Sequence, residues 1–72
     1  MKRGMSGSDV TQLINILIKK GYLKLENNET KVTGTYTYDE TIEAVVKQFQ
    51  KDNGVLSDGI CGASTTYYLL LN

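Results

Sequence analysis

The segment that decides the fold is TYDETIEAVVKQFQKDNG, residues 37–54. Its apolar residues recur at the spacing of one helical face, as Ile42, Val45, Val46 and Phe49. Thr37 and Glu40 have the spacing of a capping box, in which two side chains satisfy free backbone N–H groups at a helix start. Gly54 suits the left-handed conformation that ends many helices. The segment therefore predicts an amphipathic helix over about residues 38–52.

Helical patterns occur on both sides of this segment. The upstream apolar stripe consists of Val10, Leu13, Ile14, Leu17 and Ile18. Ser6 and Asp9 again have capping-box spacing, so we expect a first helix over residues 8–20. Downstream, the short apolar run ASTTYYLLL predicts a third helix over residues 63–71. The part TTYYLLL fits a strand equally well when taken alone, and the helical character of the rest of the chain favours the helix.

The predicted fold class is all-α, a small three-helix bundle in one domain of residues 1–72. The polar segment KLENNETKVTGT, residues 24–35, separates the first two helices and is typical of a long surface loop. No hairpin pattern is present. Thr11, Asn15 and Lys19 are expected on the outer face of the first helix, opposite its apolar stripe.

Residues 54–62 connect the second and third helices. Their Asp-Gly pair at residues 58–59 predicts a turn, because both residue types favour turn conformations. We expect Val55 and Ile60 to enter the core on either side of this turn. Gln50 is expected to hydrogen-bond to nearby backbone and not to a ligand.

Composition excludes several kinds of site. Eight basic and eight acidic residues give zero formal net charge, which argues against nucleic acid as a partner. The chain has no His and a single cysteine, Cys61, so a Ser–His triad, an intrachain disulfide and a thiol metal site are not expected, and neither is a cofactor. We also expect no signal peptide and no membrane insertion, because no run approaches about 20 apolar residues.

Four glycine-containing motifs occur in order along the chain. The first is G-x-x-G-x-D-V-x-x-L in RGMSGSDVTQLINIL, and the second is GYL at residues 21–23, after the first predicted helix. The third consists of Gly34, Tyr36, Thr41, Ala44, Val45, Phe49, Gln50 and Gly54. The last is D-G-I-x-G-x-x-T in DGICGAST. In order and spacing these motifs resemble the bacterial peptidoglycan-binding domain family over nearly the whole chain. The sequence departs from the family pattern at Ile14, where the family carries Gln, and at Ala63, where the family often carries Pro.

The resemblance implies a noncatalytic module that recognises peptidoglycan, through its stem peptide or adjoining sugar, and tethers a covalently linked hydrolase to the wall. It also implies a monomeric domain located outside the cytoplasm, in the cell wall or periplasm. We expect the ligand near the Gly-framed turns, where helix N-termini carry free N–H groups that suit a carboxylate. The residues expected to contact it are polar or aromatic: Ser6, Ser8, Asp9, Tyr36, Tyr38, Asp58, Ser64 and Tyr67.

Most of these residues also have a purely structural interpretation. Ser6 and Asp9 fit a helix cap better than a ligand contact. Asp58 fits a turn in which its side chain accepts from nearby backbone N–H groups. Tyr36 and Tyr38 are the residues that structure alone explains least, so the functional hypothesis depends mainly on them.

Three other functions fit the sequence less well. An enzyme would need paired carboxylates, at Asp39 and Glu40 or at Asp52 and Asp58, and a short chain without His has little room to enclose a substrate. A protein-interaction or inhibitory module can use the same bundle, since related folds occur in metalloprotease prodomains, but Cys61 lacks the flanking residues of the zinc-capping cysteine found there. A helix-turn-helix DNA binder is disfavoured by the acidic residues and the zero net charge.

Overall fold

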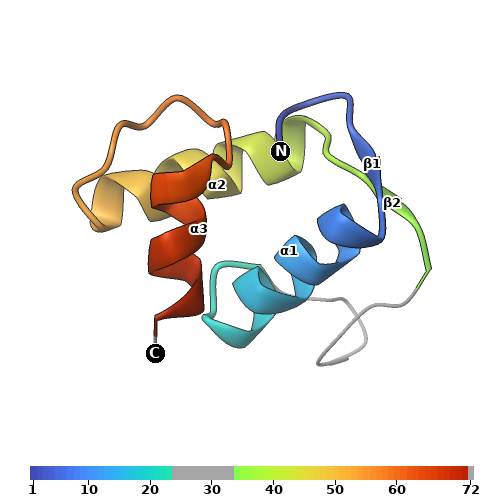
Figure 1. Ribbon diagram of the computed structural model, residues 1–72, viewed down its shortest axis with the longest axis horizontal. Helices are drawn as coiled ribbons and strands as arrows, with labels where there is room; N and C mark the ends of the chain where they lie inside the picture. Colours follow the sequence, from blue (N-terminus) through green and yellow to red (C-terminus); the bar gives the residue numbers. More distant parts are fainter. Residues whose placement is uncertain (24–33, 72) are drawn as a thin grey trace.

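The computed structural model of the chain describes residues 1–23 and 34–71 (Figure 1). It contains helices α1 (Ser8–Lys19), α2 (Glu40–Asp52) and α3 (Ala63–Leu70) and strands β1 (Ser6–Gly7) and β2 (Tyr36–Thr37). The predicted all-α class with three helices is confirmed, and the observed helix bounds lie within two residues of the predicted ones. The predicted loop of residues 24–35 lies mostly outside the described residues. Within the described residues, no helix is long and apolar enough to cross a bilayer.

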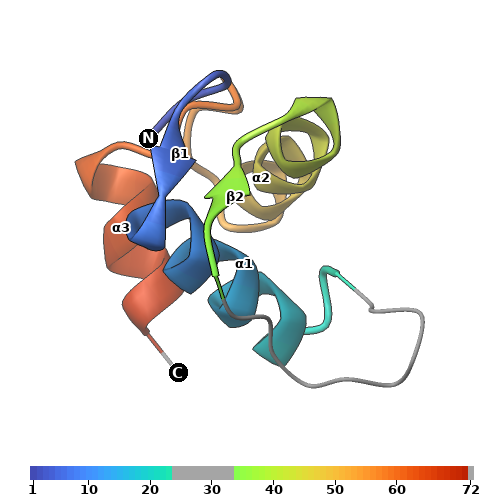
Figure 2. The same ribbon diagram turned by 90° about the vertical axis from the view of Figure 1, so that its right-hand side faces the viewer.

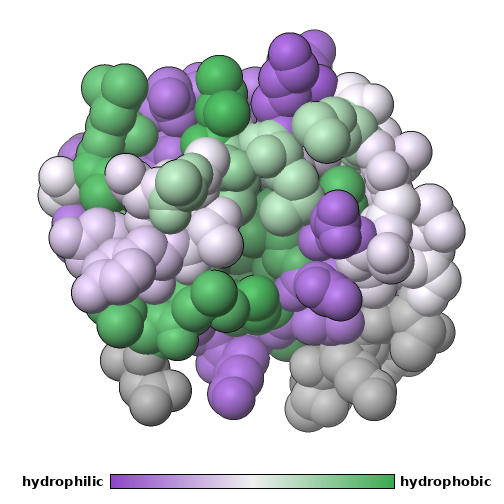
Figure 3. Space-filling view, viewed as in Figure 1, coloured by the Kyte–Doolittle hydropathy of each residue, from purple (hydrophilic) through white to green (hydrophobic). Residues whose placement is uncertain are grey.

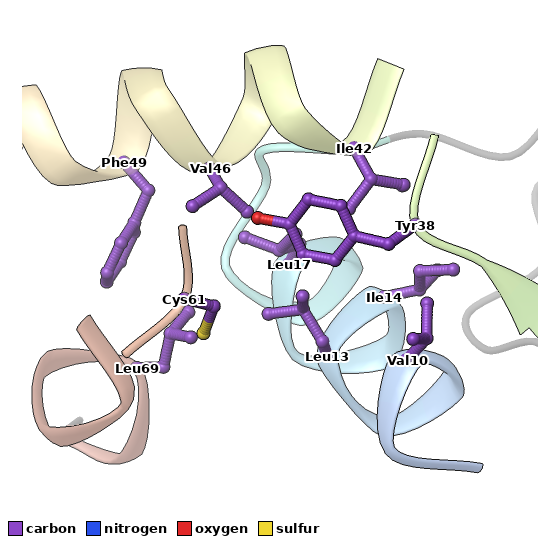
Figure 4. Packing of buried hydrophobic residues seen from close by; sticks show 10 residues of the cluster. All are labelled: Val10, Leu13, Ile14, Leu17, Tyr38, Ile42, Val46, Phe49, Cys61 and Leu69. Atoms are coloured by element: carbon purple, nitrogen blue, oxygen red, sulfur yellow. The ribbon is translucent and has the colours of Figure 1, made fainter. Parts of the chain in front are cut away.

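The core lies between α2 on one side and α1 and α3 on the other (Figures 1 and 2). The predicted apolar stripes of α1 and α2 meet there, together with one residue of α3 and two from the connecting segments (Figure 4). The buried residues are Val10, Leu13, Ile14, Leu17, Tyr38, Ile42, Val46, Phe49, Cys61 and Leu69. Helical periodicity in the sequence therefore predicts most of this small core.

The two strands form a short antiparallel ladder that the sequence did not predict. Ser6 pairs with Thr37 and Gly7 with Tyr36. Two further backbone hydrogen bonds extend the ladder, from the Gly4 N–H to the Tyr38 carbonyl (2.9 Å) and from the Tyr38 N–H to the Met5 carbonyl (2.8 Å). The segment before α1 is thereby tied to the segment before α2, as Figure 2 shows.

This ladder explains why both predicted capping boxes are wrong. Ser6 lies in β1, and the residue that precedes α1 is Gly7, with no side-chain cap. Thr37 lies in β2, so α2 begins two residues later than the predicted start and is capped by Asp39. The Asp39 Oδ1 atom accepts from the Ile42 N–H at 3.0 Å, which satisfies one of the free donors of the first turn.

One residue on the predicted outer face of α1 is a buried threonine. Thr11, expected on the outer face, is buried, and its Oγ1 donates to the Gly34 carbonyl at 2.6 Å. The chain leading into β2 covers this face of α1, so the apolar stripe does not mark the whole of the covered surface.

The segment between α2 and α3 places Cys61 in the core where Ile60 was expected. Val55 is half-buried, but Ile60 is 47% exposed, whereas Cys61 is buried. Backbone pairing fixes this register, because Met1 N donates to the Cys61 carbonyl (2.7 Å) and the Cys61 N–H donates to the Met1 carbonyl (2.6 Å). Successive residues of an extended segment point to opposite sides, so Ile60 faces outward.

Candidate functional site

Gln50 organises the segment that precedes α3. Its side chain is 1% exposed, although it is polar. Nε2 lies within hydrogen-bond distance of the Ile60 carbonyl (2.9 Å), Thr65 Oγ1 (2.8 Å) and Asp58 Oδ1 (3.1 Å). Oε1 accepts from the Gly59 N–H at 2.9 Å. The expectation that Gln50 binds backbone is confirmed, and the amide joins α2 to both the turn and the first residues of α3.

Gly59 is held at a position that no other residue fits without strain. Its φ of +76° is in the left-handed region, and a Cβ there would lie 2.8 Å from Glu43 Cγ. Its carbonyl accepts from the Tyr38 hydroxyl at 2.6 Å. The Asp58 Oδ1 atom accepts from the Ile60 N–H at 2.9 Å, which is the local bond expected of an Asp-Gly turn. The predicted turn at residues 58–59 is therefore confirmed.

A surface hollow of about 400 Å³ opens beside this turn, and we name it the turn hollow. It is lined by Gln50, Val55, Leu56, Asp58, Ile60 and residues 62–65 at the start of α3. Leu56, which is 80% exposed, and Ile60 give it apolar walls. Asp58 is the one charged residue among the described residues that line it.

The start of α3 borders the turn hollow and has backbone donors in its first turn. Gly62 is the N-cap residue, and no described side chain caps this helix start. The Thr66 N–H donates to the Gly62 carbonyl (2.9 Å) as the first bond of the helix. The N–H groups of Ala63, Ser64 and Thr65 come before it and have no acceptor among the described residues. Such groups favour negatively charged ligand atoms.

The Asp58 carboxyl group brings negative charge to the same hollow. The hydrogen bond from the Ile60 N–H, and more weakly the one from Gln50, lower the pKa of Asp58 below its usual value, while burial opposes them. The group is therefore ionised at neutral pH. The turn hollow thus combines a fixed carboxylate, free backbone donors and two exposed apolar side chains.

The predicted ligand residues fall into two groups. Asp58 and Ser64 line the turn hollow, and Tyr67 is exposed three residues further along α3. Ser6, Ser8, Asp9 and Tyr36 are also exposed, but they lie in the β1–β2 ladder and at the start of α1. Figure 1 shows these strands on the opposite side of the molecule from the start of α3. The structure does not bring the eight predicted residues into one surface.

The prediction that Tyr38 contacts the ligand is wrong. Its ring is completely buried in the middle of the core (Figure 4), and burial raises the pKa of its hydroxyl above the usual value. A ring without exposed surface cannot stack on a sugar, so Tyr38 is a structural residue that supports Gly59. Sequence reasoning missed Leu56 and Ile60 as walls of the turn hollow, because the pattern VLSDGI does not indicate which apolar residues face outward.

A second depression lies between α1 and α3, and we name it the interhelix groove. Its two adjoining parts, of about 240 and 400 Å³, share Ile16, Leu69 and Leu70. Asp9 borders one part, and Lys19 and Lys20 border the other. The face in Figure 3 shows apolar surface bordered by polar side chains. Of the two depressions, the turn hollow is the better candidate site, because it joins two predicted ligand residues to an uncapped helix start.

No group of three His, Cys, Asp or Glu residues suited to a metal occurs within residues 1–23 and 34–71.

Comparison with known proteins agrees with the motifs. Searches of curated proteins and of solved structures gave no match. The model of the family described as "Putative peptidoglycan binding domain" matches residues 6–69, which include α1, α2, all of α3 but its last residue, and the residues of the turn hollow. The chain therefore belongs to this family of peptidoglycan-binding domains.

Proposed function

We propose that this domain is a noncatalytic module that binds the stem peptide of peptidoglycan in the turn hollow and holds an attached hydrolase at the wall. The observation that supports this site most directly is the uncapped start of α3, which borders a hollow lined by Asp58 and Ser64. A stem-peptide carboxylate suits the free N–H groups there. Small apolar groups of the peptide suit Leu56 and Ile60.

The carboxylates considered for an enzyme have structural partners, which supports the noncatalytic proposal. Asp39 caps α2, and Glu40 forms an ion pair with Arg3 at 3.3 Å. Asp52 accepts from the Tyr22 hydroxyl at 2.6 Å and from Gln48 Nε2 at 2.8 Å. These groups stabilise the fold, and the chain has no His to serve as a base.

Tethering gives a shallow site a useful role. The turn hollow is open and small, so a single contact with the wall is weak. A hydrolase on the same polypeptide gains from it because each bound module raises the local concentration of enzyme at the polymer. This role places the domain outside the cytoplasm, as a monomer linked to a catalytic domain.

A sedimentation assay with purified, insoluble peptidoglycan sacculi tests the proposal and its site. Leu56→Ala removes an exposed wall of the turn hollow, and we expect it to lower the sedimented fraction. Leu70→Ala is the matched control, because Leu70 is 71% exposed and lies in the interhelix groove. Both changes remove exposed apolar surface, so neither is expected to unfold the domain.

The assay has clear contrary outcomes. If the unchanged domain does not sediment with sacculi, the proposed function is wrong. If Leu70→Ala lowers binding and Leu56→Ala does not, the wall ligand binds in the interhelix groove and the proposed site is wrong. Release of soluble muropeptides by the domain alone contradicts the noncatalytic role.

A protein-interaction role is the second candidate, and the interhelix groove favours it. Leu70 and Leu71 leave apolar surface exposed there, bordered by Lys19. The inhibitory version of this role, with a zinc-capping cysteine, has less support. Cys61 is buried, and its Sγ lies 3.6 Å from Thr66 Oγ1, inside the fold.

A further inference from the structure

The Asp58 carboxylate is held through one of its two oxygens. Oδ1 accepts from the Ile60 N–H at 2.9 Å and from Gln50 Nε2 at 3.1 Å. Among residues 1–23 and 34–71, the ion pairs found are those of Arg3 with Glu40 and Glu43, so none involves Asp58. No other described residue donates a hydrogen bond to Oδ2, and the one further local contact of the carboxylate is with the backbone N–H of Asp58 itself. The turn thus fixes the carboxylate and leaves an oxygen available.

Among the residues that the structure describes, none provides a cationic partner for the charge of Asp58. The other described residues that line the turn hollow are uncharged, and Leu56 and Ile60 expose apolar surface beside it. Lys47 packs its side-chain carbons near Gly59 and forms no ion pair with Asp58. An oriented anion beside apolar walls is complementary to a cationic donor carried on an aliphatic chain.

We infer that Asp58 binds a primary amine of the ligand, which in peptidoglycan is the free side-chain amine of the diamino acid in an uncross-linked stem peptide. This inference rests on the proposed function and narrows it to one chemical group. An ammonium supplies three donors and a full charge, whereas a sugar hydroxyl supplies one neutral donor. The aliphatic chain that carries the amine packs against Leu56 and Ile60.

The start of α3 gives the same hollow a preference for a carboxylate. A diaminopimelate side chain ends in an amine and a carboxylate on one carbon, whereas a lysine side chain ends in an amine alone. Both wall types carry the amine that Asp58 recognises. Comparing sacculi of the two types therefore shows whether the neighbouring carboxylate adds to binding.

The test removes the negative charge of Asp58 and the positive charge of the peptidoglycan amine separately. Asp58→Asn retains Oδ1 as an acceptor for Ile60 and Gln50, so the turn is preserved while the charge is lost. Asp9→Asn is the matched control, since Asp9 is exposed, borders the interhelix groove and changes the net charge equally. Sacculi of the diaminopimelate and lysine types, freed of teichoic acid, are used untreated or with their amines acetylated. Thermal unfolding of each variant verifies that it is folded.

We expect acetylation to weaken binding of the unchanged domain and of Asp9→Asn by about two- to fivefold, the size typical of one exposed ion pair. We expect Asp58→Asn to bind untreated sacculi at this weaker level and to be insensitive to acetylation. If acetylation leaves binding of the unchanged domain intact on both wall types, the amine inference is wrong and the proposed function stands. If no sacculi are bound at all, the proposed function itself is wrong, and the inference falls with it.

Discussion

At the scale of single residues, hydrogen bonds of buried polar atoms hold the conformation of the loop before α3. Gln50 uses both ends of its amide, and the Tyr38 hydroxyl bonds to the Gly59 carbonyl. Each of these buried groups has a partner, and no buried side-chain N or O atom of the described residues lacks one. Removal of one partner leaves another group buried and unsatisfied, which is the costly case.

Gly59 and Gly54 form a matched pair that separates backbone strain from steric contact. Their φ angles are +76° and +72°, but an added Cβ meets other atoms only at Gly59. We expect Gly54→Ala to lower the free energy of unfolding by about 1 kcal/mol, since only left-handed strain is added. Gly59→Ala should cost about 1–2 kcal/mol more, because Glu43 must move.

Urea-induced unfolding of the two glycine variants measures this difference. Equal losses for both substitutions would show that Glu43 and Lys47 move aside freely. The turn hollow would then tolerate side chains at this turn.

At the scale of helices and strands, the sequence predicted the helices, which have a repeating apolar pattern, and missed the two short strands. Apolar residues at helical spacing recur over several turns, so α1 and α2 were recognised from many residues at once. β1 and β2 have two residues each, which is too few for an alternating pattern to be detected. The ladder therefore stayed hidden, and so did the burial of Tyr38 that follows from it.

The candidate site was predictable in part for the same reason. Asp58 belongs to a turn dipeptide with a local cause, so its position could be inferred. Whether Ile60 or Cys61 enters the core depends on pairing with Met1, which is distant in sequence. The capping errors also have a physical origin, because Thr37 and Asp39 both stand near the start of α2 and only tertiary pairing selects between them.

The cap of α2 provides a test at this scale. We expect Asp39→Ala to lower the free energy of unfolding by about 1 kcal/mol, because the Ile42 N–H loses its acceptor. Thr37→Ala should change it by less than about 0.5 kcal/mol, since Thr37 is exposed in β2. Chemical denaturation of both variants is the measurement. A larger loss for Thr37→Ala would restore the capping box predicted from the sequence.

At the scale of the whole molecule, a small core is supplemented by bonds between distant segments. The Tyr22 hydroxyl donates to Asp52 Oδ2 at 2.6 Å, and the Tyr22 ring packs edge-on against Phe49. Lys20 Nζ donates to the Leu71 carbonyl at 2.7 Å. These contacts join the end of α1 to the ends of α2 and α3.

The bond between Tyr22 and Asp52 makes part of the stability depend on pH. This bond, with the one from Gln48, lowers the pKa of Asp52 below its usual 3.8. The same bond raises the pKa of Tyr22 above its usual 10.0. A lowered acid pKa stabilises the fold above the unfolded value and loses its effect as the pH falls through the folded value. The contribution is therefore present at neutral pH and is lost in acid, and it is lost again as Tyr22 ionises in base.

Comparison of the unchanged domain with Tyr22→Phe tests this dependence. We expect Phe, which retains the ring packing, to be less stable at about pH 7, with the difference shrinking toward about pH 2 as Asp52 becomes protonated. Thermal unfolding across this range is the measurement. A difference that stays constant with pH would mean that the ring, and not the hydrogen bond, accounts for the contribution of Tyr22.

The pairing of Met1 with Cys61 also bears on the order in which the chain assembles. The bonds of Gln50 join residues 8 to 15 positions apart, whereas the Met1–Cys61 bond spans 60 positions. Closing a long loop costs more chain entropy than closing a short one, so α2 and the turn have the cheaper contacts. We therefore expect the turn to form around Gln50 early in folding. The segment that contains Met1 is then expected to pair with Cys61 last, after α2 and the turn have formed.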